Sequence, residues 1–230
     1  MVSKTRMLDL VKAWDAAAVD AALVETPGLL DVRDPRGRNW LHIACGRKLA
    51  GDPAASLATV DVLLGHGLPL DGEAFREGEW RATPLWFAVA HGQNRPLAEH
   101  LLRRGCTPNY CLWAAAWNDD PEMIRLLVAH GADIEDFTAP GEKPLLWAVK
   151  WSKFRAAEAL LELGAEPDAQ DGAGRTAVHC MLKKGSDPAH VELFIRKGAR
   201  IDIPDGEGRT AREILARKRD PRLRRLAETA

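Results

Sequence analysis

The stretch LGAEPDAQDGAGRTAVHCM, residues 163–181, decides the fold of this 230-residue chain. Its second residue is a glycine that ends an apolar run, and the stretch then passes through a segment rich in Asp and Gly and ends in a second apolar run. Gly164 suits the left-handed residue that ends a helix, residues 171–174 suit a hairpin tip, and Thr176 suits the cap of a new helix. The stretch therefore predicts a helix, a hairpin turn and a second helix.

The same pattern recurs along the chain. Leu112, Leu145 and Val178 are spaced 33 residues apart, and Thr210 follows Thr176 by 34. The glycines that follow an apolar run are Gly67, Gly105, Gly131, Gly164 and Gly198. A period of this length indicates stacked helical units, each of which buries its apolar face against its neighbours.

The segments that begin the units resemble a known signature. Thr83-Pro-Leu-Trp-Phe-Ala88 is similar to the T-P-L-H-x-A motif of the ankyrin repeat, a unit of a turn and two antiparallel helices. The resemblance covers residues 30–228 and implies an all-α ankyrin-repeat solenoid of about five helix-turn-helix units with short hairpin turns and divergent terminal caps. We expect an N-terminal helical cap over 1–30, repeats over 31–204 and a C-terminal capping repeat over 205–230, in one continuous domain.

Composition limits the classes of partner. With 32 basic and 33 acidic residues the net charge is −1, which argues against a nucleic-acid binder, because such proteins need a basic excess. The basic run at 217–225 is interpreted as the solvated face of the C-terminal cap. No apolar run of spanning length occurs, and charged residues interrupt the N-terminus where a secretory signal would lie. We expect a cytoplasmic monomer that binds neither nucleic acid nor membrane, and the excess of Arg over Lys indicates a bacterial source.

Three departures from the repeat point to function, because loops on a rigid scaffold commonly carry it. Residues 47–56 lengthen the link between two helices, and residues 71–80 lengthen the turn that enters the next unit. Residues 106–111 instead run almost directly into a helix, so that this third repeat lacks its hairpin. We expect a notch where the extended tip lies beside the deleted one.

Tryptophan is concentrated in the irregular zone, since six of the eight Trp residues fall within 80–151. We interpret Trp86, Trp113 and Trp147 as packing between helices. Trp117 and Trp151 follow the small-residue face of their helices and are expected to point outward, as binding hot spots do.

The resemblance implies a non-enzymatic module that binds a partner protein through its concave face and hairpin tips. The proposed anchors and polar rim are Trp117, Trp151, Trp80, Phe75, Lys150, Arg155 and Asn118. Two alternatives remain open: a small ligand held in a Trp-lined notch beside the missing hairpin, or action as an inhibitor or antidote of a partner enzyme.

No catalytic, metal or cofactor site is predicted. His42 and His179 occupy the signature position and are interpreted as structural histidines bonded to turns. Cys106 and Cys111 lack a second pair of metal ligands and are read as small buried hydrophobes. Asp119-Asp120 precedes a helix and is explained by capping.

Overall fold

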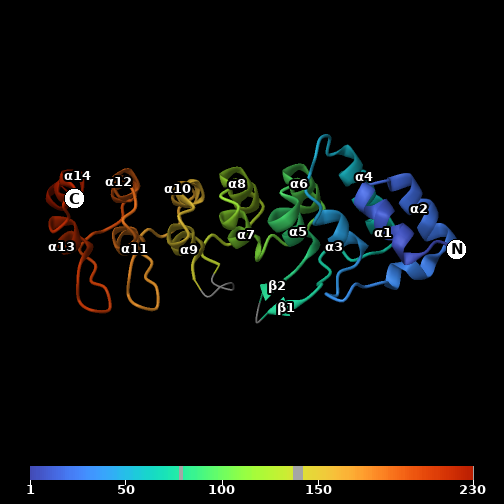
Figure 1. Cartoon of the computed structure of the whole chain (residues 1–230), viewed down its shortest axis with the longest axis horizontal. Coiled ribbons are helices and arrows are strands. Elements are labelled where there is room, and N and C mark those ends of the chain that lie inside the picture. Colours follow the sequence, from blue (N-terminus) through green and yellow to red (C-terminus); the bar gives the residue numbers. More distant parts are fainter. Residues whose placement is uncertain (78–79, 137–141, 230) are drawn as a thin grey trace. The chain divides into compact units, whose positions relative to one another are not determined.

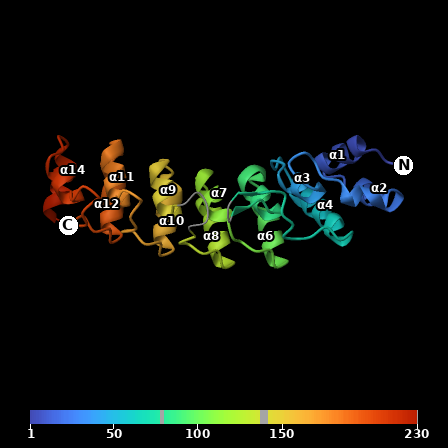
Figure 2. The same cartoon turned by 90° about the horizontal axis from the view of Figure 1, so that it is seen from below.

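The computed structural model describes residues 1–77, 80–136 and 142–229. Consecutive helices form pairs along the chain (Figures 1 and 2). The pairs are α1 (Lys4–Ala13) and α2 (Ala16–Glu25), α3 (Trp40–Cys45) and α4 (Ala54–Gly65), α5 (Pro84–Phe87) and α6 (Arg95–Arg103), α7 (Cys111–Trp117) and α8 (Pro121–Ala129), α9 (Pro144–Lys150) and α10 (Phe154–Glu162), α11 (Ala177–Lys184) and α12 (Pro188–Arg196), and α13 (Ala211–Ala216) and α14 (Pro221–Thr229). The predicted all-α arrangement, about five helical pairs between two terminal pairs, is confirmed.

The chain forms two compact units. The first contains residues 1–114 with 129–132, and the second contains residues 115–128 with 133–230. In the first unit, α3 packs against both α1 and α5, while α4 packs against α2 and α6. In the second unit, α11 packs against both α9 and α13, and α12 packs against α14, so first and second helices form separate layers (Figure 1).

Each pair ends in the way that the sequence predicts. The glycine after the second helix adopts a left-handed backbone, with φ between +91° and +98° in five successive units. The apolar run before that glycine supplies a side chain that is fully buried: Leu63, Leu101, Leu127 and Leu160 are 0% exposed. These leucines carry the periodic core that stacks the pairs.

Polar side chains cap the N-terminus of the first helix in several pairs. Asn39 Oδ1 accepts a hydrogen bond from His42 N at the start of α3, and Thr83 Oγ1 accepts one from Trp86 N at the start of α5. Thr210 Oγ1 does the same for Glu213 N at the start of α13. These bonds satisfy N–H groups that the first turn of a helix leaves without a partner.

The lengthened turn at 71–80 is a two-stranded hairpin. Strands β1 (Arg76–Glu77) and β2 (Trp80–Arg81) are antiparallel, with Glu77 opposite Trp80. By contrast, residues 106–110 join α6 to α7 through a short turn, without a strand. Two short helices complete the description: η1 (Pro27–Asp31) follows α2, and η2 (Ala88–Gly92), a turn of π-helix, continues α5.

Candidate protein-binding surface

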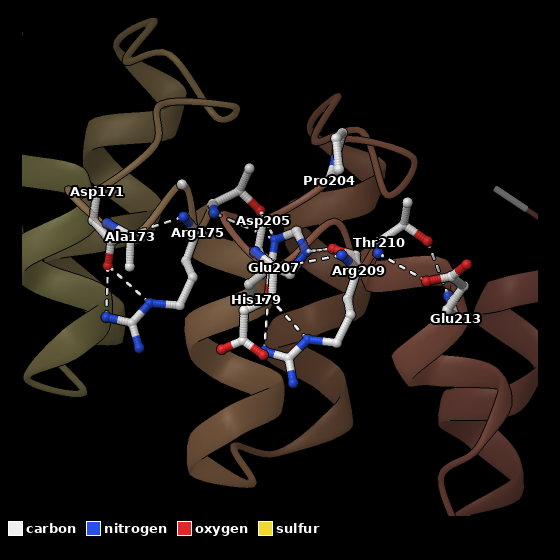
Figure 3. A network of polar contacts seen from close by, with 12 residues as sticks. Asp171, Ala173, Arg175, His179, Pro204, Asp205, Glu207, Arg209, Thr210 and Glu213 are labelled. Carbon is white, nitrogen blue, oxygen red and sulfur yellow. Dashed lines mark hydrogen bonds and ion pairs between the residues drawn. The ribbon is translucent and has the colours of Figure 1, made fainter.

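The hairpin turns of the second unit are held by a repeated hydrogen-bond pattern (Figure 3). Asp205 Oδ1 accepts hydrogen bonds from the backbone N–H groups of Glu207 and Arg209, at 2.9 and 3.0 Å, and the Arg209 guanidinium donates to Oδ2. Asp171 repeats this pattern in the preceding turn, with its own arginine four residues later. Gly206 N donates a hydrogen bond to the carbonyl oxygen of Ala173 in the neighbouring hairpin, at 2.9 Å, and this bond links the two hairpin tips.

The signature histidines tie one repeat to the next. His179 Nδ1 accepts from Thr176 N, and its Nε2 donates to Arg209 O at 3.1 Å, thirty residues later (Figure 3). His42 makes the same pair of contacts, with Asn39 N and Gly72 O. Burial lowers the pKa of His42 to about 4, so the ring is neutral at physiological pH. The prediction that both histidines are structural is confirmed.

Three indoles of the second unit lie together and form what we call the Trp patch: Trp117, Trp147 and Trp151. Their ring centroids are 5.5 to 5.9 Å apart. Trp117 ends α7 and is 46% exposed, and Trp151 follows α9 and is 55% exposed, whereas Trp147 beneath them is buried. The Lys153 ammonium lies 5.5 Å from the centre of the Trp117 ring, within cation–π range. The predicted exposure of Trp117 and Trp151 and burial of Trp147 are confirmed.

Asp119 lies beside the Trp patch and links its two repeats. Its Oδ1 accepts a hydrogen bond from Ala156 N at 2.8 Å, in the first turn of α10. Asp120 Oδ1 accepts from Met123 N and caps its own helix, α8, as predicted. Asp119, which was expected to serve the same helix, instead caps a helix of the following repeat.

The residues predicted to form the polar rim lie in two different environments. Arg155 is an exposed rim residue, with its guanidinium 4.0 Å from a Glu122 oxygen, and Asn118 is half-buried directly after Trp117. Lys150, however, is held in ion pairs with Glu142 and with Asp171, the latter at 2.9 Å.

Lys150 therefore belongs to the support of the hairpin rather than to an open rim, which corrects its predicted place. The Asp171 side chain is 1% exposed. Although burial alone would raise the pKa of Asp171, hydrogen bonds from Arg175 and Lys150 outweigh it and hold the pKa well below its ordinary value. A carboxylate that stays charged so far inside the turn needs both cations.

The predicted anchors of the extended tip belong to the first unit. Phe75 is 39% exposed, but Trp80 is only 8% exposed. The Trp80 ring packs edge-on against Phe75 at 5.3 Å and against Trp86 at 4.9 Å. The prediction of Trp80 as an exposed anchor is wrong, because the strand places this indole over buried Trp86. Trp113, also expected to pack between helices, is half-buried.

The shortened link of the third repeat is fastened to the extended tip. Cys106 Sγ donates to Asp71 Oδ1 at 2.8 Å, and Thr107 N donates to the same carboxylate. Burial, followed by the bond to Asp71, raises the pKa of the Cys106 thiol. All four cysteines are buried, and none forms a disulfide. A thiol in this state is a packing group and a poor nucleophile.

Neither a metal site nor a membrane span emerges from the described residues. Within 1–77, 80–136 and 142–229, no cluster of His, Cys, Asp and Glu could hold a metal ion. Over the same ranges, every helix is too short or too polar to cross a bilayer.

The sequence is similar to a family of repeats and to part of a larger protein. Residues 85–171 match the ankyrin-repeat family as three copies. A 118-residue stretch is 34% identical to transient receptor potential cation channel subfamily A member 1 of Drosophila melanogaster, covering 45% of this chain and 10% of that protein. The chain therefore spans about a tenth of the length of this relative.

Solved structures show the same fold over nearly the whole chain. The ankyrin repeat domain of human ASB11 superposes with a TM-score of 0.76 at 20% identity, covering 100% of this chain and 99% of that one. The ankyrin repeat domain of Bcl-3, a member of the IkappaB protein family, gives 0.75 at 20% identity, covering 96% and 97%.

Proposed function

This chain contains ankyrin repeats and has the ankyrin-repeat fold, and from that premise we propose that it is a non-enzymatic module that binds a partner protein through the Trp patch. Ankyrin repeats are generally interaction modules. The observation that carries the proposal is the exposure of Trp117 and Trp151 side by side. Exposed, adjacent indoles are costly in water and are typical of binding hot spots.

The support beneath the Trp patch favours binding, because a rigid surface loses little entropy when a partner docks. Buried Trp147 backs both exposed rings, and Lys153 fixes the orientation of Trp117. Asp119 then fastens the turn after Trp117 to α10. The rings are thus held in place before the partner arrives.

The surroundings of the patch set its specificity. Arg155 and Asn118 supply the polar rim that excludes water around a hot spot. Phe75 offers a separate apolar contact on the hairpin tip of the first unit. Lys150 acts indirectly, by neutralising the Asp171 carboxylate under the turn.

The setting of the protein is part of the same proposal. Four buried cysteines that form no disulfide suit a reducing compartment such as the cytoplasm, and the Arg-rich composition suits a bacterial source. We propose a monomer that docks on proteins rather than on nucleic acid or lipid. Inhibition of a partner enzyme is one consequence that such docking would have.

Capture from a native lysate tests the proposal. The wild type is compared with Trp117→Ala/Trp151→Ala, and with Val24→Ala, which removes an exposed apolar side chain of the first unit. We expect the double variant to lose a protein that the wild type and the Val24 variant both retain, with all three of equal thermal stability. Truncation of a hot-spot residue costs about 2 kcal/mol, so the loss should exceed tenfold.

Two results would overturn the proposal. Equal capture by the wild type and the double variant would move the site away from the Trp patch. Capture of nothing by the wild type, together with a melting shift on addition of a small cationic or apolar molecule, would favour the small-ligand alternative, because indoles also form cages for such molecules.

A further inference from the structure

A cationic groove lies in the first unit, formed by α1, the turn at 33–38, α3 with the two residues after it, the end of α5 and His91 of η2. Its volume is about 670 Å³. One carboxylate lines it, that of Asp34. The basic residues that line it are Lys4, Lys12, Arg33, Arg36, Arg38 and Arg47. This local excess occurs in a chain whose net charge is −1.

The single carboxylate is already satisfied. Asp34 Oδ1 accepts from the backbone N–H groups of Arg36 and Arg38, and Oδ2 accepts from Arg38 Nε at 2.7 Å. Although burial opposes the shift, the Arg38 hydrogen bond holds the pKa of Asp34 below its ordinary value. Asp34 therefore shapes the turn and neutralises only Arg38.

The remaining cations of the groove lack acidic partners. Arg33 donates to the backbone carbonyls of Leu30 and Val32, at 2.9 and 3.0 Å. Across the part of the chain that the structure describes, no carboxylate lies within ion-pair distance of the other four cations, Lys4, Lys12, Arg36 and Arg47. Several arginines elsewhere are paired with carboxylates at the surface, as in the pairs Arg125–Glu162, Arg200–Asp168 and Arg212–Asp202.

Aromatic rings orient two of the guanidinium groups. Arg47 lies 5.6 Å from the centre of the Trp14 ring, and Arg38 lies 5.8 Å from that of Phe87. A guanidinium held over a ring still presents its hydrogen-bond donors at the ring's edge, so Arg47, which unlike Arg38 makes no pair with Asp34, can direct them to a ligand. Burial lowers the pKa of His91, and the charges of Arg38 and Arg36 lower it further, so their field reaches into the groove.

Apolar side chains also line the groove, and they favour a peptide over a nucleic acid as its ligand. Leu8, Val32 and Ile43 contribute to its surface, together with the Trp40 and Phe87 rings. A phosphate backbone gains nothing from such a surface, whereas a peptide can place an apolar side chain on it between two acidic ones. Nucleic-acid binding also calls for a basic stripe longer than one groove.

We propose that this groove binds an acidic peptide segment of a partner protein. The carboxylates of the peptide pair with Arg33, Arg36 and Arg47, and an apolar side chain packs on Leu8 and Ile43. The choice of a peptide rests on the proposed protein-binding function, but the groove belongs to the first unit and the Trp patch to the second. The two surfaces can therefore be tested separately.

The test is a fluorescence anisotropy titration of the whole chain with a labelled 12-residue peptide of Glu, Asp and Leu. A Lys/Leu peptide and a single-stranded oligonucleotide serve as comparison probes. We expect the acidic peptide to bind best, and its affinity to fall as salt rises, because charge pairs at an exposed groove are screened.

Two double variants locate the binding site. Lys12→Gln/Arg36→Gln removes two cations that line the groove and make no ion pair with a described carboxylate. Arg196→Gln/Lys197→Gln removes the same charge from the exposed end of α12 in the second unit. We expect the groove variant to lose about tenfold in affinity and the control less than twofold, with unchanged circular dichroism and melting for both.

The outcomes separate the two proposals. Absence of peptide binding to the wild type, an equal loss in both variants, or preference for the oligonucleotide would each overturn the groove proposal. Unchanged peptide affinity in Trp117→Ala/Trp151→Ala would support it, since the groove acts without the Trp patch. Failure of the groove would leave the Trp patch to be decided by the capture experiment alone.

Discussion

Replacement of Asp119 by alanine is expected to lower the free energy of unfolding by about 2–3 kcal/mol. Asp119 adopts a left-handed backbone, with φ of +52°. Its Oδ1 also caps α10 by accepting from Ala156 N, and the residue before that helix, Lys153, offers no side-chain cap of its own. Alanine would remove the cap and would be strained at this φ.

The two contributions can be separated by the choice of side chain. Loss of an N-cap costs about 1 kcal/mol, and alanine tolerates the left-handed region less well than Asp or Asn, which adds up to about 1–2 kcal/mol. Asp119→Gly loses the cap without the strain, so about 1 kcal/mol is expected. Asp119→Asn keeps an acceptor oxygen and tolerates this backbone, and it should cost less than about 1 kcal/mol, mainly through lost interaction with the helix dipole.

Urea unfolding and thermal melting of the three variants measure these differences. The alanine variant should melt roughly 5–10 °C below the wild type, followed by the glycine and then the asparagine variant. Hydrogen exchange at the Ala156 amide should accelerate in the Ala and Gly variants, because that N–H loses its acceptor. Equal free energies of unfolding for the Ala and Gly variants would refute the contribution of backbone strain at residue 119. Slow exchange of the Ala156 amide in both variants would refute the role of Asp119 as the cap of α10.

Two further predictions concern the first unit. A Cβ at Gly92 would overlap the carbonyl oxygen of Cys45, so Gly92→Ala should cost about 2 kcal/mol in urea unfolding, whereas Gly172→Ala, which meets no atom within 4 Å, should be nearly neutral. Because the folded-state pKa of His42 is about 4, below the unfolded value of about 6.5, the unfolded chain takes up the proton first, and about 2–3 kcal/mol of stability should be lost as pH falls from about 6.5 to about 4. The same pH dependence in wild type and His42→Gln would contradict this reasoning.

The repeat could be predicted from sequence because its determinants are local and periodic. A glycine after an apolar run, and a Thr or Asn before the next one, fix the two ends of the helices without reference to distant residues. Trp117 and Trp151 were placed correctly for the same reason, since their exposure follows from their position after a small-residue face.

The predictions for Trp80 and Lys150 are wrong because each residue makes a contact whose sequence separation is unrelated to the repeat period. Trp80 is buried because β2 turns it onto Trp86, and the sequence does not reveal that the extended tip is a hairpin. Lys150 pairs with Asp171, 21 residues later, a spacing that the period does not suggest. The groove could not be predicted from the sequence, because its cations come from α1, from the turn at 33–38 and from the residue pair after α3, which only the fold brings together.

The ties between repeats give both proposed surfaces their rigidity. His42 reaches Gly72 O from the lining of the cationic groove, and Asp119 reaches Ala156 N from the turn after Trp117. In each case one side chain in a repeat satisfies a backbone group of the next, 30 or 37 residues later. A repeat stack is stabilised by such nearest-neighbour terms, so a change in one unit loosens the surface of its neighbour. Substitutions at these ties should therefore weaken binding without touching the partner, which is why stability must be matched before any loss of affinity is assigned to a contact.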